Sequence, residues 1–97
     1  MGRFRSYQKS LIERLKDPKE AAAYLNAALE DDDLRVFLVA LRNVAEAHGG
    51  ISSLAKETRL NREGLYRTLS RQGNPTIINL FFILDALKLE VKLKAVV

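Results

Sequence analysis

The sequence predicts an all-α fold: a small helical bundle with a helix-turn-helix and a short C-terminal β-strand that we expect to take part in dimerisation. Three observations indicate this fold class. Apolar residues recur at helical spacing over most of the chain, residues that start and stop helices separate these segments, and alternation of period two is confined to the C-terminal end. With 97 residues, the chain is expected to form a single domain over 1–97.

The N-terminal helices are expected within residues 7–48. A short first helix is predicted around 7–16, and a second over 18–30, because Asp17 can cap free amides and Pro18 fits the first helical turn. A third helix should start from a cap at Asp33 and end at the two glycines after residue 48. It is apolar over so much of its circumference that we expect it to be the central helix. The only histidine, His48, lies at its end and is expected to cap terminal carbonyls.

Residues 52–71 have the spacing of a helix-turn-helix. Ser52 or Ser53 can cap a short helix that reaches residue 58, the chain then turns at Arg59, and Asn61 can cap a second helix that extends to about residue 71. In such a motif a small residue and several apolar residues face inward, so that the two helices can cross closely. The residues at these inward positions are Ala55, Leu60, Leu65 and Leu69.

The opposite face of the second helix carries groups suited to the edges of DNA bases. Arginine can donate two hydrogen bonds to guanine, asparagine can pair with adenine, and glutamate can accept from cytosine. Cations and hydroxyls around this face would contact phosphates, which fix the register of a protein on DNA without reading its sequence. The predicted DNA-binding residues are Ser52, Ser53, Lys56, Arg59, Asn61, Arg62, Glu63, Tyr66, Arg67 and Arg71.

Two residues of this segment carry a conformational cost. Gly64 inside a helix costs about 0.5 to 1 kcal/mol relative to alanine, so its missing side chain should admit close approach either by a neighbouring helix or by DNA. Arg59 stands where such motifs usually carry glycine with positive φ, and a left-handed arginine costs on the order of 1 kcal/mol. We expect Arg59 to adopt this conformation and to place a cation near the phosphate path.

A last helix is expected over 76–87, capped by Thr76, and a strand over 89–96. The helix should bury one apolar stripe, and the strand shows alternation of apolar residues with lysine and glutamate. Since a single strand cannot satisfy its own backbone, it needs either the same strand of a second subunit or an edge on another protein. The predicted buried stripe consists of Ile77, Leu80, Phe81, Leu84 and Leu87.

Composition and charge restrict the possible functions. The net charge is +4, and it is unevenly distributed: about +3 over 1–29, −3 over 30–50, +3 over 51–75 and +1 over 76–97. The basic 51–75 segment favours a polyanionic partner. The chain has no cysteine, no paired-carboxylate motif and no phosphate-binding glycine loop, so we expect neither an enzyme nor a cofactor or metal site. No apolar run could span a membrane, and we expect a cytoplasmic protein.

Over residues 17–94 the sequence resembles the probable addiction-module antidote family, whose members are small antitoxins with a phage-repressor-like helix-turn-helix. The most specific matching segments are "AAYLNAALE", "LAKET", "NREGLYRTLS" and "GNP", in this order and spacing. The family usually has glycine at two positions where this chain has Arg59 and Lys88. The DNA-reading positions of the family correspond to Ser52, Ser53, Arg62, Glu63, Tyr66 and Arg67.

The resemblance implies a bacterial antitoxin that binds a cognate small toxin of the ribonuclease type and, as a homodimer, represses its own operon by binding double-stranded operator DNA. The helices around Tyr24 and the acidic run 30–33 are candidates for the surface that holds a basic toxin. Two alternatives remain open: a helix-turn-helix transcriptional regulator without a toxin partner, and a helical protein-interaction module that does not contact DNA.

Overall fold

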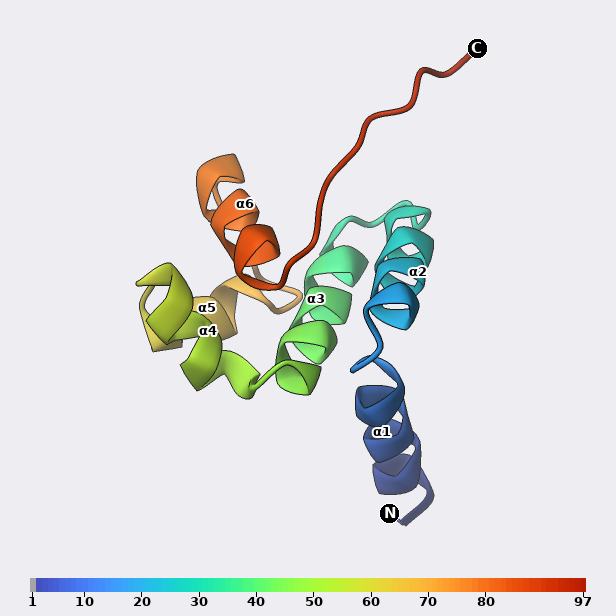
Figure 1. The fold of residues 1–97 in the computed structure, drawn as a ribbon, viewed down its shortest axis with the longest axis vertical. Coiled ribbons are helices and arrows are strands. Elements are labelled where there is room, and N and C mark those ends of the chain that lie inside the picture. Colours follow the sequence, from blue (N-terminus) through green and yellow to red (C-terminus); the bar gives the residue numbers. More distant parts are fainter. Residues whose placement is uncertain (1) are drawn as a thin grey trace.

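The computed structural model describes residues 2–97, with side chains from Ser6 onward, and this part of the chain contains six α-helices (Figure 1). The prediction of an all-helical protein is therefore confirmed. The helices are α1 (Gly2–Arg14), α2 (Pro18–Leu29), α3 (Arg35–Ala47), α4 (Gly50–Thr58), α5 (Arg62–Thr68) and α6 (Ile77–Ala86).

Three of the predicted N-caps are confirmed. The Asp17 carboxylate accepts a hydrogen bond from the Lys19 amide at 2.9 Å, and the Asn61 side chain accepts one from the Gly64 amide at 2.9 Å. The Thr76 hydroxyl accepts from the Asn79 amide at 3.1 Å. Each of these side chains satisfies a backbone donor that has no partner within its helix, which fixes where α2, α5 and α6 begin.

The predicted serine cap of α4 is wrong, and the predicted Asp33 cap lies one residue before the N-cap position of α3. α4 begins before the serines, because Gly49 and Gly50 adopt positive φ of 101° and 87° and turn the chain directly into the helix. Ser52 and Ser53 consequently lie inside the first turn of α4. α3 has no side-chain cap at its N-cap residue, Leu34, although the carboxylate of Asp33 accepts from the Arg35 amide at 3.0 Å.

The predicted central position of α3 is confirmed, since α3 packs against α1, α2 and α4 (Figure 1). Leu41, Val44 and Ala45 on this helix are completely buried. α6 packs against α4 on the other side of the core. The helix pair α4 and α5 is thus packed against the rest of the core, because α4 contacts both α3 and α6.

The His48 side chain contacts a carbonyl at a helix end, as expected, but this carbonyl belongs to the end of α1 rather than to α3. Its Nε2 atom lies 3.2 Å from the carbonyl oxygen of Leu15, one residue beyond the end of α1. A histidine that donates to this carbonyl satisfies an acceptor left without a partner at the helix end. The contact connects the end of α3 to the end of α1.

The predicted strand over 89–96 is wrong, because no residue of the described chain forms a β-strand. Lys88 turns the chain after α6 with φ of 61°, the Leu89 amide donates to the Leu84 carbonyl at 2.9 Å, and every residue from 90 onward is exposed. The segment extends away from the helices, with its end far from them (Figure 1). An alternating pattern defines a strand only where a second edge supplies hydrogen bonds, and this single chain offers none.

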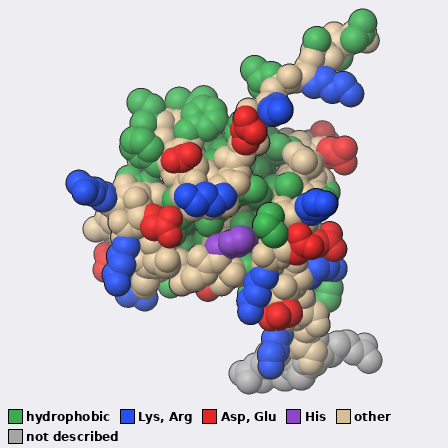
Figure 2. Space-filling view, viewed as in Figure 1, with side chains coloured by type: hydrophobic (Ala, Val, Ile, Leu, Met, Phe, Trp, Pro, Cys, Tyr) green, Lys and Arg blue, Asp and Glu red, His purple; other side chains and the backbone are tan. Residues whose placement is uncertain are grey.

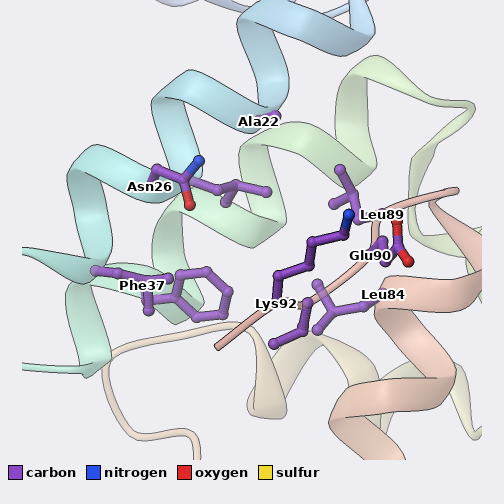
Figure 3. A pocket seen from close by; sticks show the side chains of 10 residues that line it. Ala22, Asn26, Phe37, Leu84, Leu89, Glu90 and Lys92 are labelled. Atoms are coloured by element: carbon purple, nitrogen blue, oxygen red, sulfur yellow. The ribbon is translucent and has the colours of Figure 1, made fainter. Parts of the chain in front are cut away.

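The first residues of this C-terminal segment border a groove between α2, α3 and α6. Leu89, Glu90 and Lys92 lie on one side of it, and Phe37 and Asn26 lie on the other (Figure 3). Leu89 is the last residue that packs against the core. The groove therefore marks where the helical body ends and the exposed segment starts.

The buried stripe of α6 was predicted only in part. Leu84 and Leu87 are buried as expected, but Ile77 and Phe81 are 67% and 47% exposed, and Ile83 is completely buried instead. α6 is apolar on almost all sides, so the spacing of its apolar residues could not identify the inward face. On α2, Leu29 is likewise 48% exposed.

Candidate nucleic-acid interface

α4 and α5 are joined by the three residues 59–61, as the sequence predicted. Arg59 has φ of 62° and ψ of 18°, which confirms its left-handed conformation, and its amide donates to the Ala55 carbonyl at 2.8 Å. The Thr58 hydroxyl donates to the Leu54 carbonyl at 2.8 Å and accepts from the Leu60 amide at 3.2 Å. These bonds satisfy the end of α4 and make a non-glycine residue tolerable in the turn.

The inner face of α5 packs as predicted. Leu65 is 2% exposed and Leu69 is completely buried, while Ala55 and Leu60 pack against the same core at its edge. α5 ends at Thr68, which is shorter than the predicted extent to residue 71. With both leucines fixed inward, the opposite face of α5 is fixed outward.

The predicted DNA-binding residues are almost all accessible. Ser53 and Tyr66 are half-buried and the others are exposed. Asn61, Arg62, Glu63 and Arg67 lie at the start and along the outer side of α5. This side carries two arginines and one glutamate, which suits a negatively charged partner that also offers hydrogen-bonding groups.

A cluster of two arginines and one tyrosine connects α5 to the central helix. The guanidinium carbon of Arg62 lies 5.6 Å from the centre of the Tyr66 ring, and that of Arg42 lies 5.2 Å from the same centre. Such contacts between a cation and an aromatic ring orient both groups. Arg42, on α3, lies beside this candidate surface and was not predicted from the sequence, where its only signal was an isolated charge within an otherwise apolar run.

Two predicted phosphate contacts lie apart from this cluster. Arg71 is located beyond the end of α5, and its Nη2 atom lies 3.8 Å from a carboxylate oxygen of Asp33. Hydrogen bonds from the Arg35 side chain and amide, followed by the nearby positive charges of Arg35 and Arg71, lower the pKa of Asp33 below its ordinary value. Arg59 borders a hollow shared with Phe82 and Lys88 at the end of α6.

Gly64 has no close neighbour that requires a glycine. A Cβ atom built at this position would meet only atoms of Asn61, at 3.7 Å and 3.8 Å, which are ordinary contact distances. The first explanation offered by the sequence, close approach by a neighbouring helix, is therefore wrong. Within the described residues, no packing contact accounts for a glycine at this position of α5.

Within residues 2–97, no helix combines the length and the apolar character that spanning a membrane requires. The same residues contain no group of three or more histidine, cysteine or carboxylate side chains placed to hold a metal ion. The chemistry available at the α4–α5 surface is therefore that of charged and hydrogen-bonding side chains.

The six helices and the polar outer side of α5 define a small all-helical protein with an accessible, charged short helix. By sequence, the chain belongs to the family described as probable addiction module antidote proteins, whose sequence model matches residues 6–95. The chain is also similar to an uncharacterized protein of Haemophilus influenzae, with 35% identity over 84 residues that cover 87% of this chain and 86% of that protein. No solved structure matches the chain. Family membership indicates an antidote role in an addiction module, with a toxin as partner.

Proposed function

We propose that this protein is a DNA-binding antitoxin of a toxin–antitoxin module, which neutralises a small ribonuclease-type toxin by direct binding and represses its own operon. The observation that carries the DNA-binding part is the division of α5 into two sides. Leu65 and Leu69 anchor one side in the core, whereas Arg62, Glu63 and Arg67 occupy the accessible side. A short helix held in this way can enter the major groove, where side chains reach base edges.

Arg62 and Arg67 would make the contacts that distinguish sequences, because guanidinium groups can donate two hydrogen bonds to one guanine. Glu63 would accept from a cytosine. Asn61 is less available to DNA, since its side-chain oxygen already accepts a hydrogen bond from the Gly64 amide at 2.9 Å. Its main task is to cap α5, and only its amino group remains for a base or phosphate.

Tyr66 on α5 and Arg42 on α3 would support the DNA contact. Tyr66 lies within 5.2 Å and 5.6 Å of the two guanidinium carbons of Arg42 and Arg62. A half-buried ring between two arginines restricts their side-chain freedom before binding, which lowers the entropy cost of holding them against DNA. Arg42 is best suited to a phosphate, because it belongs to α3 rather than to α5.

As a homodimer, the protein would place two copies of α5 in successive major grooves, about 34 Å apart, on a palindromic operator. Occupancy of the promoter would then block transcription. Each phosphate contact releases counterions, so binding should weaken steeply as salt is raised.

The toxin would be held on another surface, for which the connection between α2 and α3 is our candidate. Glu30, Asp31 and Asp32 are exposed there, and a basic toxin would be attracted to them. Asp33 is less available because Arg35 and Arg71 already contact it. Tyr24 is likewise engaged, since its hydroxyl accepts from the Asn43 side chain at 2.9 Å.

Co-expression with the neighbouring open reading frame, followed by purification and a gel shift on the upstream DNA, tests this proposal. We expect a complex of the two proteins and a specific shift. If the upstream DNA shifts but no partner protein is retained, the protein is a transcriptional regulator without a toxin. If a partner is retained and no DNA is shifted at low salt, α5 has no role in DNA binding and the protein is an interaction module.

A further inference from the structure

The outer face of α6 is apolar and uncovered. Ile77 and Ile78 are 67% and 64% exposed, and Phe81 and Phe82 are 47% and 52% exposed. Figure 2 shows hydrophobic side chains gathered over this helix. Single exposed apolar residues are normal on protein surfaces, but two isoleucines and two phenylalanines on one short helix form a contiguous patch of the kind that marks an interaction site.

These four residues share one side of α6. Their spacing of one, four and five positions places them within a single arc of the helix, and Ile83 and Leu84 are buried on the remaining part of its circumference. α6 therefore has two apolar faces, of which the fold uses one. The second face requires an occupant outside this chain.

The charge of the patch favours a second copy of the same chain over a basic toxin. The stretch from residue 76 to residue 84 contains no charged residue, so two identical faces can meet without bringing like charges together. At its edge, the hollow beside Phe82 is bordered by charges of both signs, which can complement those of an identical copy across a two-fold axis. These edge residues are Glu57, Arg59, Asp85 and Lys88.

The position of the patch also suits a two-fold dimer on DNA. α6 packs directly against α4, the first helix of the α4–α5 pair. In each copy α4 packs against both α6 and α5, so a contact between two copies of α6 would fix the distance between the two α5 helices. The four side chains offer only roughly 400 Å² per copy, which is at the low end for a protein interface, so the dimer should dissociate on dilution.

We infer that the outer face of α6, formed by Ile77, Ile78, Phe81 and Phe82, is the surface through which two copies of this chain associate. The inference rests on the proposed function, which requires a dimer, and it names the surface that forms the dimer. The exposed C-terminal segment has no part in it.

Sedimentation of the protein without DNA tests the inference. The wild type should change from monomer to dimer as its concentration is raised, whereas Phe82→Asp and Ile78→Lys should remain monomeric at the same concentrations. Leu93→Asp is the matched control, because Leu93 is 96% exposed on the C-terminal segment, and it should associate as the wild type does. Circular dichroism verifies that each variant is folded, and two independent α6 variants guard against the failure of one.

Because the chain has no cysteine, a single introduced thiol gives a second readout. In a symmetric contact a residue near the axis meets its own counterpart, so Ile78→Cys or Phe81→Cys should form a disulfide-linked dimer on mild oxidation, and Leu93→Cys should not. Dimerisation of both α6 charge variants, or a wild type that is monomeric at all concentrations, would overturn the inference. If the wild type is monomeric at all concentrations and still binds the upstream DNA, the inference about α6 is overturned and the DNA-binding proposal remains in place.

Discussion

The two ends of α5 differ in what surrounds them. At the C-terminal end Leu69 is completely buried, and the loop that follows returns so closely that a Cβ at Gly73 would collide with the Thr68 carbonyl oxygen. At the N-terminal end Arg62 and Glu63 are exposed, and a Cβ at Gly64 would make only ordinary contacts, with Asn61. The C-terminal end is therefore determined by packing within the chain, whereas the N-terminal end is left available to a partner.

This difference separates two reasons for a glycine. Gly73 is required by the fold because backbone atoms occupy the space that a side chain would need. Gly64 is not required by the fold, and we propose that the close approach of DNA requires it. Substitutions at the two ends should consequently affect different measurements: stability at the C-terminal end, and DNA binding at the N-terminal end.

The largest expected effect is that of Gly73→Ala. The added methyl group would collide with the backbone of Thr68 and press on the Leu38 side chain, which lies 3.1 Å from the built Cβ. We expect a loss of about 3 kcal/mol in the free energy of unfolding, measured by urea denaturation. Gly64→Ala is the matched control, and an equal effect of the two substitutions would remove the distinction between the two ends of α5.

A smaller effect is expected for Asn61→Ala. This change leaves the Gly64 amide without the acceptor that now lies 2.9 Å away. The loss of an N-cap should lower the free energy of unfolding by about 1 kcal/mol, again measured by urea denaturation. Asn61→Ser should restore most of it, because serine also caps well. A stability unchanged in Asn61→Ala would show that packing alone holds the start of α5.

Arg59→Gly should act in the opposite direction. Glycine adopts the φ of 62° found at this position without the steric cost that arginine bears, but it also gains freedom in the unfolded chain. We expect a net increase of up to about 1 kcal/mol in the free energy of unfolding, detected as a higher melting temperature. Lys88→Gly, at the other left-handed residue, is the parallel case. A clear decrease in the Arg59 variant would mean that its side chain makes stabilising contacts in the hollow beside Phe82.

The smallest effect on stability is expected for Gly64→Ala, which should raise the free energy of unfolding by about 0.5 to 1 kcal/mol because alanine is the better helix residue. The same substitution should weaken binding to the upstream DNA, since a methyl group would stand where the DNA backbone or a base approaches. A variant that is more stable and binds DNA as the wild type does would leave Gly64 without a function.

Most of the helices could be predicted from residues close together in the sequence. Features that depend on contacts with distant parts of the structure could not be predicted. Asp17, Asn61 and Thr76 cap helices through atoms two or three residues away, so their roles could be read from the sequence. The strand over 89–96 was predicted from a pattern that acquires meaning only beside a second edge, and none is present. The buried face of α6 also depends on which neighbouring elements pack against it, and the sequence pattern does not give this.

The candidate site shows the same limit. Leu65 and Leu69 fixed the direction of α5 because helical spacing alone places them on one side. Arg42 could not be found, because its proximity to Tyr66 arises from the tertiary fold, in which α4 packs against both α3 and α5, rather than from spacing along the chain. Arg71 was expected near phosphates, but the loop after α5 turns it towards Asp33.

The most direct test of the DNA-binding proposal is the affinity of Arg62→Ala and Arg67→Ala for the upstream DNA, measured by fluorescence anisotropy against a scrambled duplex at two salt concentrations. Each substitution should cost roughly 1 to 3 kcal/mol on the specific sequence and less on the scrambled one. Arg14→Ala, an exposed arginine at the end of α1, is the control and should change neither affinity appreciably. Unchanged binding of the upstream DNA by the double variant Arg62→Ala, Arg67→Ala would contradict the assignment of α5 as the recognition helix.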